Sequence, residues 1–541
     1  MTGQQRFETH EVFNQPPAFE NINLYTSNAV LMAAVEREGG GAAAGELAAY
    51  GERAGSSEML RAGRLANEFP PQLKSFDARG QRVDAVEFHP AYHELMACSA
   101  KAGMHCRSWE DEPGRNVARA AIVYLGYQME PGHTCPLVMT NACVAAMRHQ
   151  PALAEIWQPR IVRRAYDGAD IPASEKSGVT IGMGMTEKQG GTDVRANTTR
   201  AEPAGSDGEY VLVGHKWFMS APMCDGFLVL AQALGGLSCF LMPRFLPDGS
   251  RNPMNLMRLK GKLGNWSNAS SEVEFAGVHG WLVGEEGRGV ATIIEMVTFT
   301  RLDCAVASAG LMRWGLANAL HHTSHRTVFQ KKLIDQPLMR TVLADLSLDC
   351  EAATALTFRL ARAFDNQDDE FEQAFARLMT PAIKYWVCKS APGFTYEAME
   401  CLGGGGYVEE GPMAWAFREA PLNAIWEGSG NVMCLDVARV AARAPETLER
   451  IVAWLSSCGD KRIASAAGVL AAELSSAANL EADLRVIVER LVLLAAGAIL
   501  LEAAPATISE SFIASRLEGG FRTTYGQLNG ADISGILSAR E

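Results

Sequence analysis

The spacing of apolar residues changes along the chain and predicts helices first and strands afterwards. Up to about residue 180, apolar positions recur at helical spacing, as in SSEMLRAGRLANEF (56–69) and GRNVARAAIVYLGYQM (114–129). Between residues 181 and 286 this periodicity fades, and short strand-like runs separated by turns appear: EYVLVGHKWFMS, GFLVLAQA, LSCFLMP and SEVEF. We therefore expect a helical domain over residues 1–180 and a β-domain over residues 181–286.

Long helical patterns return after the β-domain. The run from Val290 to Arg326 suits an elongated helical bundle, which we expect over residues 287–444. Residues 445–541 carry further helical stretches, ETLERIVAWLSS and LEADLRVIVERLVLLAAGAILLEAA, which predict an additional C-terminal helical domain. The segment REGGGAAAGELAAYG (37–51) is predicted to be a flexible loop. This order of helices, strands and helices predicts an α+β fold whose middle domain is a β-barrel or sandwich.

Composition excludes several classes of protein. A chain of 541 residues exceeds the size of a single core, and its net charge of −13 argues against a surface that coats nucleic acid throughout. The longest apolar run, Leu491 to Leu501, is too short to cross a membrane, and residues 1–13 do not resemble a signal peptide. The twelve cysteines lack metal-ligand spacing, so we expect buried thiols and no metal site. We expect a cytoplasmic protein.

Two stretches of the predicted β-domain are candidates for a binding pocket. In IGMGMTEKQGGTDV (181–194), small residues let a ligand approach the backbone, and the hydroxyls of Thr186 and Thr192 can bond a polar ring edge. In GHKWFMSAP (214–222), Trp217 and Phe218 can cover a planar ligand while Ser220 holds its edge. A plain turn and an ordinary core tryptophan are the alternatives. Neither stretch is the G-x-G-x-x-G fingerprint of a Rossmann fold.

Three later stretches add candidate residues. SHRTVFQKKLIDQP (324–337) presents Arg326 and Phe329 at helical i, i+3 spacing, able to grip a pyrophosphate and support a ring, or forming a solvated basic helix end. CLGGGGY (401–407) breaks a helix and predicts a tight loop beside a ligand or another chain. NAIWEGSGN (423–431) places one acid, Glu427, between an indole and small residues. A loop residue near a helix start is the alternative.

Taken in order, MTEKQGGTD, KWFMS, HRTVF, CLGGGGY and WEGSGN resemble the acyl-CoA dehydrogenase superfamily over about residues 180–440. VFNQPPAFENINLYTSN (12–28), LGNWSNASSEVEF and IWEGSGNVMCLDVARV resemble more closely its AidB-type alkylation-response flavoproteins. The long N-terminal region and the C-terminal helical domain agree with this subgroup. The likeness extends over most of the chain.

The resemblance implies FAD bound without covalent attachment between the β-domain and the following helices, in tetramers whose subunits complete each other's sites. The expected contacts fall into four groups: Met185, Thr186, Gly191 and Thr192 at the flavin ring or ribityl chain; Trp217, Phe218, Met219 and Ser220 near the reactive N5 edge; Arg326 and Phe329 at the pyrophosphate and adenosine, from a neighbouring subunit; and Gly428, Ser429 and Asn431 at the FAD.

Glu427 falls on the position of the family's usual catalytic base, which removes the α-proton of an acyl thioester while a hydride passes to flavin N5. Burial beside Trp426 would raise its basicity. Some branched-chain members place the base at the position of Thr300, and threonine cannot serve as one. Glu400 replaces the usual glutamine, and Trp426 replaces a tyrosine, so we expect a bulky or unusual substrate. The AidB-type resemblance implies a weak, isovaleryl-CoA-like dehydrogenase activity.

The AidB-type resemblance also implies protection of DNA against alkylation and binding of double-stranded DNA without sequence preference, with Arg439 at an implicated position. The tail after Pro445 holds eight Lys and Arg against twelve Asp and Glu. DNA binding would therefore depend on a local cluster such as Arg160, Arg163 and Arg164, or on a groove built by the tetramer. A metabolic acyl-CoA dehydrogenase with an added domain and a non-catalytic DNA-shielding flavoprotein remain alternatives.

Overall fold

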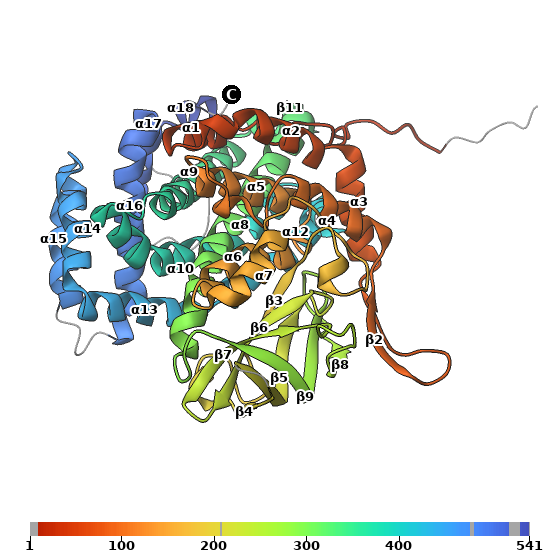
Figure 1. Cartoon of the computed structure of the whole chain (residues 1–541). Helices are drawn as coiled ribbons and strands as arrows, with labels where there is room; N and C mark the ends of the chain where they lie inside the picture. Colours follow the sequence, from red (N-terminus) through yellow and green to blue (C-terminus); the bar gives the residue numbers. More distant parts are fainter. Residues whose placement is uncertain (1–8, 206–207, 476–480, 519–530, 540–541) are drawn as a thin grey trace, which may run out of the picture.

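The N-terminal third of the chain is helical and carries one hairpin. The computed structural model describes residues 9–205, 208–475, 481–518 and 531–539. Its first elements are α1 (Ala29–Arg37), α2 (Ala44–Ala54), α3 (Ser57–Glu68), β1 (Gln72–Phe76), β2 (Arg82–Glu87), α4 (Pro90–Lys101), α5 (Arg115–Met129), α6 (Thr134–Met147) and α7 (Pro151–Ile161). The antiparallel β1–β2 hairpin projects from the helices beside the β-domain (Figure 1).

The expectation of a flexible loop over residues 37–51 is wrong. Gly41–Ala43 form a 3₁₀ turn, and α2 begins at Ala44. Alanine has the highest helix propensity, and the apolar residues of α2 are spaced so that Leu47, Tyr50 and Ala54 all face the core. Helical spacing therefore outweighs the glycine content of the segment.

The middle domain is a mixed β-sheet that closes on itself. Its strands are β3 (Ile181–Gly184), β4 (Arg200–Pro203), β5 (Glu209–Ser220), β6 (Gly226–Ala233), β7 (Gly236–Pro243), β8 (Met254–Leu259) and β9 (Ser270–Val283). The strand order is β3-β6-β4-β5-β9-β7, with β8 on β9, and the further β6–β7 pairing closes the path. The predicted strand runs are confirmed as β5, β6, β7 and β9, and with them the α+β fold.

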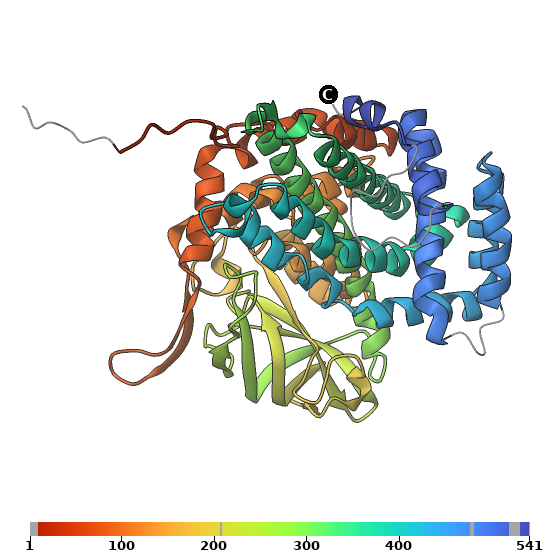
Figure 2. The ribbon, with the colours of Figure 1, turned by 180° about the vertical axis from the view of Figure 1, so that it is seen from behind.

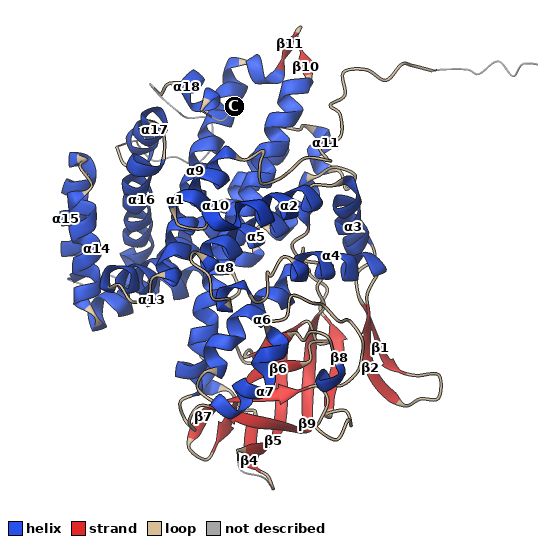
Figure 3. Cartoon of the chain, turned by 45° about the horizontal axis from the view of Figure 1, so that its top comes forward, coloured by secondary structure: helices blue, strands red, loops and turns tan. Residues whose placement is uncertain are grey.

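A bundle of long helices follows. Its helices are α8 (Gly289–His325), α9 (Pro337–Asp365), α10 (Glu370–Glu400), α11 (Gly404–Tyr407), α12 (Met413–Glu419) and α13 (Gly430–Arg443). At a rise of about 1.5 Å per residue, α8 is about 55 Å long, so it begins beside the sheet and ends at the opposite end of the molecule (Figure 3). The expected domain limits at residues 180, 286 and 444 all fall between elements and remain predictions.

The prediction that Arg326 and Phe329 share a helix is wrong. The helix ends at His325, and a short hairpin of β10 (Thr327–Val328) and β11 (Lys331–Lys332) follows. Phe329 and Gln330 at its tip have φ of 50° and 64°, as the two-residue turn of a hairpin requires.

The C-terminal helices pack along one side of the bundle. They are α14 (Pro445–Ser457), α15 (Lys461–Ser475), α16 (Leu484–Ala503), α17 (Ala506–Arg516) and α18 (Ile533–Ser538), and Figure 2 shows them in blue beside the bundle. The apolar run of α16 is buried against α9 and α10. Across the described residues, no helix combines the length and apolar character that a membrane span requires. All twelve cysteines are free thiols, and ten of them are buried.

A buried ion pair joins the N-terminal helices to the bundle. The Arg119 guanidinium on α5 binds the Asp303 carboxylate on α8 through two hydrogen bonds of 2.7 and 2.9 Å, and both side chains are at most 3% exposed. Arg119 Nε also donates to the carbonyl of Met104 at 2.7 Å. A charge so deeply buried is tolerated only with its partner in place.

We predict that Asp303→Asn lowers the free energy of unfolding by about 3–5 kcal/mol, because the Arg119 charge stays buried without its counter-ion. Denaturant unfolding of the purified variants measures this change. The control is Glu370→Gln, which removes the partly exposed pair with Arg450 and should change stability by less than about 1 kcal/mol. A similarly small loss in Asp303→Asn would contradict the role given to the buried pair.

Candidate functional site

A cavity of about 1180 Å³ lies where the β-domain meets α5, α6, α8 and the loop before α13. We call it the central cavity. Ten of the residues singled out from the sequence line it: Met185, Thr186, Gly191, Thr192, Phe218, Ser220, Glu427, Gly428, Ser429 and Arg439. The structure thus brings together stretches that are more than two hundred residues apart in the sequence.

The walls of the central cavity suit a planar ligand with a polar edge. Met183, Met185 and Phe218 supply apolar surface, and the hydroxyls of Thr186 and Ser220 supply hydrogen-bonding groups. Gly191 packs tightly against the neighbouring threonine, since a Cβ placed there would meet Thr186 Oγ1 at 2.5 Å. The chemistry of this lining fits an isoalloxazine ring.

Two of the predicted residues on β5 do not line the central cavity. The pairing of β5 with β9 is irregular between Lys216 and Met219, and in this part of the strand Phe218 and Ser220 line the cavity while Trp217 and Met219 do not. Met219 is fully buried in the core of the β-domain. The indole of Trp217 lies under the Lys260 ammonium, whose nitrogen is 3.2 Å from the ring centroid.

Three further predicted residues lie away from the central cavity. Asn431 on α13 accepts a hydrogen bond of 2.8 Å from Arg485 Nε. Arg326 and Phe329 belong to the β10–β11 hairpin at the far end of α8 (Figure 3). The Arg326 guanidinium donates to the carbonyl of Asn14 at 2.7 Å, and Phe329 is 90% exposed. The chain therefore cannot bring this hairpin to its own cavity.

The N-terminal segment secures that hairpin. Asn14 Nδ2 donates to the carbonyl of Thr327 at 2.8 Å, and the Thr327 amide donates back to Asn14 Oδ1 at 2.7 Å. His321 near the end of α8 bonds the carbonyl of Pro17 at 2.8 Å. The FNQPP portion of the N-terminal motif thus has a structural role beside Arg326.

Glu427 occupies a strained turn that two buried cations hold. Its φ is 58°, a left-handed conformation that is unfavourable for a glutamate, and Gly428 follows with a φ of 104°. Arg301 Nε on α8 donates to the Glu427 carbonyl at 3.0 Å. Lys384 Nζ on α10 donates to the carbonyls of Trp426 and Gly428 at 2.9 and 2.5 Å. Charge-assisted hydrogen bonds of this kind fix the backbone on both sides of the acid.

The side chain of Glu427 faces the central cavity. Its Oε2 atom is buried and accepts no hydrogen bond from any residue that the structure describes. Burial raises the pKa of the carboxyl, and the Thr300 hydroxyl and the nearby Arg301 charge oppose this rise only in part. Thr300 and Glu427 thus converge on one point of the cavity, and Glu427 is the group there that can accept a proton.

Several residues at the site escaped the sequence analysis. Lys384 is 1% exposed within an otherwise apolar stretch, TPAIKYWV, and this lone charge is the signal that identifies it. Tyr127, Lys262, Asn265 and Asn423 also line the central cavity. These polar residues carry no spacing signal, because they come from three separate segments.

A second cavity, of about 670 Å³, adjoins the central cavity and is rich in arginine. We call it the arginine groove. Six arginines line it: Arg195, Arg288, Arg301, Arg377, Arg439 and Arg443. Asp436 is the one acid among the described residues that line it, and it binds Arg301 at 2.7 Å and Arg439 at 2.8 Å.

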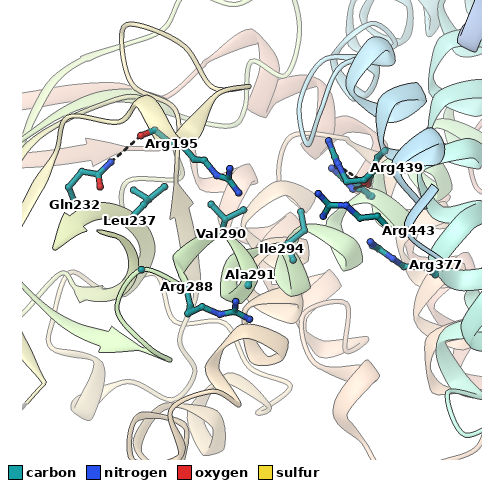
Figure 4. Close-up of a pocket in the computed structure, with 13 residues that line it drawn as sticks. Arg195, Gln232, Leu237, Arg288, Val290, Ala291, Ile294, Arg377, Arg439 and Arg443 are labelled. Carbon is teal, nitrogen blue, oxygen red and sulfur yellow. Dashed lines mark hydrogen bonds and ion pairs between the residues drawn. The ribbon is translucent and has the colours of Figure 1, made fainter. Parts of the chain in front are cut away.

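The arginines come from opposite walls of the groove (Figure 4). Arg439, Arg443 and Arg377 lie together on one side, and Arg195 and Arg288 lie on the other side. Arg195, Arg301, Arg439 and Arg443 line both cavities, so the groove lies directly beside the central cavity. The surplus of positive charge makes it a site for anions, and phosphate groups match guanidinium geometry well.

The alternative cluster of Arg160, Arg163 and Arg164 is less available. Arg164 forms ion pairs with Glu110 at 2.5 Å and Glu46 at 2.9 Å. Arg160 donates to the carbonyl of Ile156 within its own helix. The arginine groove therefore carries more uncompensated positive charge than this cluster.

Comparison with known proteins matches three regions of the chain. Residues 14–168 match the N-terminal domain of the adaptive response protein AidB, residues 182–278 the middle domain of acyl-CoA dehydrogenases, and residues 287–442 their C-terminal domain. The chain is 51% identical over 437 residues to the putative acyl-CoA dehydrogenase AidB of Escherichia coli K12, covering 80% of this chain and 81% of that protein.

Relatives from an animal are also similar. Acyl-CoA dehydrogenase family member 11 of Caenorhabditis elegans is 32% identical over 414 residues, covering 73% of this chain and 66% of that protein. The crystal structure of Caenorhabditis elegans ACDH-11 in complex with C11-CoA superposes with a TM-score of 0.86 at 28% identity, covering 96% of this chain and 95% of that one.

The fold, the sequence identity and the site geometry all indicate the same family of proteins. The match to the E. coli protein spans most of both chains, and residues 14–168, outside the two matched acyl-CoA dehydrogenase domains, match the AidB N-terminal domain. The chain belongs to the AidB-like members of the acyl-CoA dehydrogenase family, which are FAD-dependent oxidoreductases.

Proposed function

We propose that this protein oxidises the Cα–Cβ bond of an acyl-CoA thioester, with FAD in the central cavity and Glu427 as the catalytic base. The observation that carries the proposal is the Glu427 side chain, which lines a cavity suited to a planar ring and whose buried Oε2 lacks a partner among the described residues. A weak activity on short branched thioesters of the isovaleryl-CoA type is the expected form.

The residues of the β-domain would hold the cofactor. Met185 and Phe218 would lie against the ring, and Thr186, Thr192 and Ser220 would bond its polar edge, with Gly191 allowing close approach. Gly428 and Ser429 would meet it from the bundle side. Bound FAD supplies the two-electron acceptor of the oxidation.

Glu427 would accept the α-proton of the thioester. Burial disfavours its charged form and so strengthens it as a base. Trp426 also lines the cavity and fills more space than a tyrosine would. The hydrogen bonds from Arg301 and Lys384 to the backbone would hold the carboxylate in place before the substrate binds.

The arginine groove would take the phosphate groups of the CoA. It shares four arginines with the central cavity, so a thioester in that cavity would extend its phosphate-bearing end toward Arg377 and Arg443. The C. elegans ACDH-11 structure holds C11-CoA, which supports an acyl-CoA as the class of substrate.

The exposed hairpin supports a homo-oligomer, which we propose to be a tetramer. Phe329 is 90% exposed on the β10–β11 hairpin, and Leu338 and Tyr407 are 83% and 79% exposed. Large apolar side chains on a surface commonly mark an interface. Arg326 and Phe329 would then complete the FAD site of a neighbouring subunit.

We also propose that the protein binds double-stranded DNA and so limits its alkylation. Six arginines against one aspartate give the arginine groove the charge that phosphate backbones require. Arg439 is half-exposed within it. The match of residues 14–168 to the N-terminal domain of the adaptive response protein AidB is the comparison that bears on this role.

We predict that Glu427→Gln slows the bleaching of the flavin band by acyl-CoA under anaerobic conditions by roughly 10²–10⁴-fold. The amide keeps the size of the side chain and removes the base. Stopped-flow absorbance with isovaleryl-CoA and straight-chain acyl-CoAs measures the rate, and Glu370→Gln is the control. Rapid bleaching in Glu427→Gln would contradict the proposed base. No bleaching in the unmodified protein would favour a non-catalytic DNA-shielding role.

We predict that Phe329→Ser reduces the affinity for FAD and weakens the tetramer, since it removes an exposed ring proposed to reach the neighbouring subunit. Light scattering gives the mass in solution, and flavin fluorescence gives the FAD affinity. Val12→Ser removes another exposed apolar side chain, 74% exposed in the N-terminal segment, as a control. A monomer that binds FAD with full affinity would contradict the shared site.

We predict that the double change Arg439→Ala and Arg443→Ala weakens DNA binding to every sequence and lowers the slope of log affinity against log salt by about 2. Fluorescence anisotropy with a short duplex at several salt concentrations measures both quantities. Arg450→Ala, which removes a partly exposed arginine paired with Glu370, is the matched control. An unchanged slope would exclude the arginine groove as the DNA site.

A further inference from the structure

A chain of buried polar groups lies behind Trp426. The Trp426 indole Nε1 donates to Asn423 Oδ1 at 2.8 Å, and the Tyr127 hydroxyl lies 3.2 Å from the same oxygen. That hydroxyl also lies 3.3 Å from Glu419 Oε1. The chain therefore runs from a buried carboxyl group, through a phenol and an amide, to the residue beside the proposed base.

Glu419 is the deepest member of this chain. It closes α12, is 2% exposed, and accepts a hydrogen bond of 2.9 Å from Asn265 Nδ2. Two other charged groups face it: the Glu130 carboxylate from the end of α5, and the Lys262 ammonium, which contacts Asn265 Oδ1 at 3.4 Å. Burial, with the Glu130 charge, raises the pKa of Glu419 to about 7.

The protonation of Glu419 decides where the Tyr127 proton points. A hydroxyl has one proton, and it lies within reach of two acceptors, Glu419 Oε1 and Asn423 Oδ1. An ionised Glu419 attracts that proton. A neutral Glu419 can itself donate to the phenol oxygen, so that the Tyr127 proton turns to Asn423.

Asn423 connects the direction of the Tyr127 hydroxyl proton to the turn that carries Glu427. Its amide is anchored on the other side, because Nδ2 donates to Ser308 Oγ on α8 at 3.1 Å. With the amide held, Oδ1 is shared between Tyr127 and the Trp426 indole. A stronger bond from Tyr127 therefore competes with the bond that orients the Trp426 ring, which lies next to Glu427.

We propose that Glu419 is a positioning residue for the active site: through Tyr127 and Asn423 it sets the orientation of Trp426, and thereby the alignment of Glu427 with the substrate. This inference rests on the proposed function of Glu427. A purely structural role for Glu419, filling and satisfying the interior, is the alternative that the experiment must separate.

The test compares Glu419→Gln and Tyr127→Phe with the unmodified FAD-loaded protein. Tyr124→Phe is the matched control, because Tyr124 is buried on the same helix and its hydroxyl bonds Thr354 at 3.2 Å, away from the central cavity. We measure the visible circular dichroism of the bound flavin between pH 5.5 and 8.5 without substrate. Anaerobic flavin reduction by an acyl-CoA is followed over the same range.

We expect the unmodified protein and Tyr124→Phe to show a change in the flavin spectrum with a midpoint near pH 7. Glu419→Gln should lack it, and should reduce its flavin about tenfold more slowly, because the alignment of the reacting groups is relaxed. Tyr127→Phe should slow reduction by about fivefold, the equivalent of one hydrogen bond. The flavin spectrum of Tyr127→Phe should also lose its change near pH 7, although Glu419 is still present in this variant.

Thermal unfolding checks that Glu419 itself titrates. A folded-state pKa above the unfolded value means that the native protein loses stability as pH rises from about 4.3 to about 7. Glutamine does not titrate, so the variant does not lose this stability. The melting temperature of Glu419→Gln minus that of the unmodified protein should therefore rise by a few degrees as pH increases across this range.

The outcomes are distinct. A pH-dependent melting difference with an unchanged flavin spectrum and unchanged reduction rate would overturn the positioning role and leave a structural one. A melting difference that does not depend on pH would also overturn it. If no thioester reduces the flavin of the unmodified protein, the proposed function fails. The substrate-free spectral change still decides whether Glu419 acts on the flavin environment.

Discussion

The turn at Trp426–Gly428 depends on two buried cations that bond its carbonyl groups. A non-glycine residue with positive φ costs roughly 1–3 kcal/mol, and such a conformation persists only where its surroundings enforce it. Arg301 and Lys384 enforce it from two different helices of the bundle. Because α8, α10 and the start of α13 meet at this turn, the position of Glu427 follows from the packing of the whole bundle.

These cations serve the backbone more than the carboxylate. A nearby positive charge normally lowers the pKa of an acid, and that would weaken a base. Arg301 instead directs Nε to a carbonyl and Nη1 to Asp436, which shares its charge. Desolvation therefore remains the largest influence on Glu427, and its pKa is raised. The cations hold the backbone of the turn, while desolvation raises the pKa of the base against their charge.

Local patterns in the sequence predicted most helices and strands. They did not predict which side chains meet in the site, because those residues come from distant parts of the chain. Period-two runs identified β5 and β9, and helical spacing identified α8 as one long helix. The irregular pairing of β5 between Lys216 and Met219 lies where Phe218 lines the cavity and Trp217 does not, and the KWFMS motif alone does not reveal this difference. The prediction that Phe329 lies on a helix is wrong. The positive φ angles of Phe329 and Gln330, which form the hairpin turn, cannot be predicted from the spacing of residues along the sequence. The arginine groove draws on loops and helices from Arg195 to Arg443, so no single window of sequence contains it.

The central claim is that Glu427 stands ready to take a proton from a thioester bound in the central cavity. A crystal structure of the FAD-loaded protein with an unreactive acyl-CoA analogue tests it most directly. The account predicts a Glu427 carboxylate oxygen about 3–3.5 Å from the α-carbon, with φ still near the present 58°. A carboxylate turned away from the α-carbon, or a thioester bound elsewhere on the protein, would contradict it.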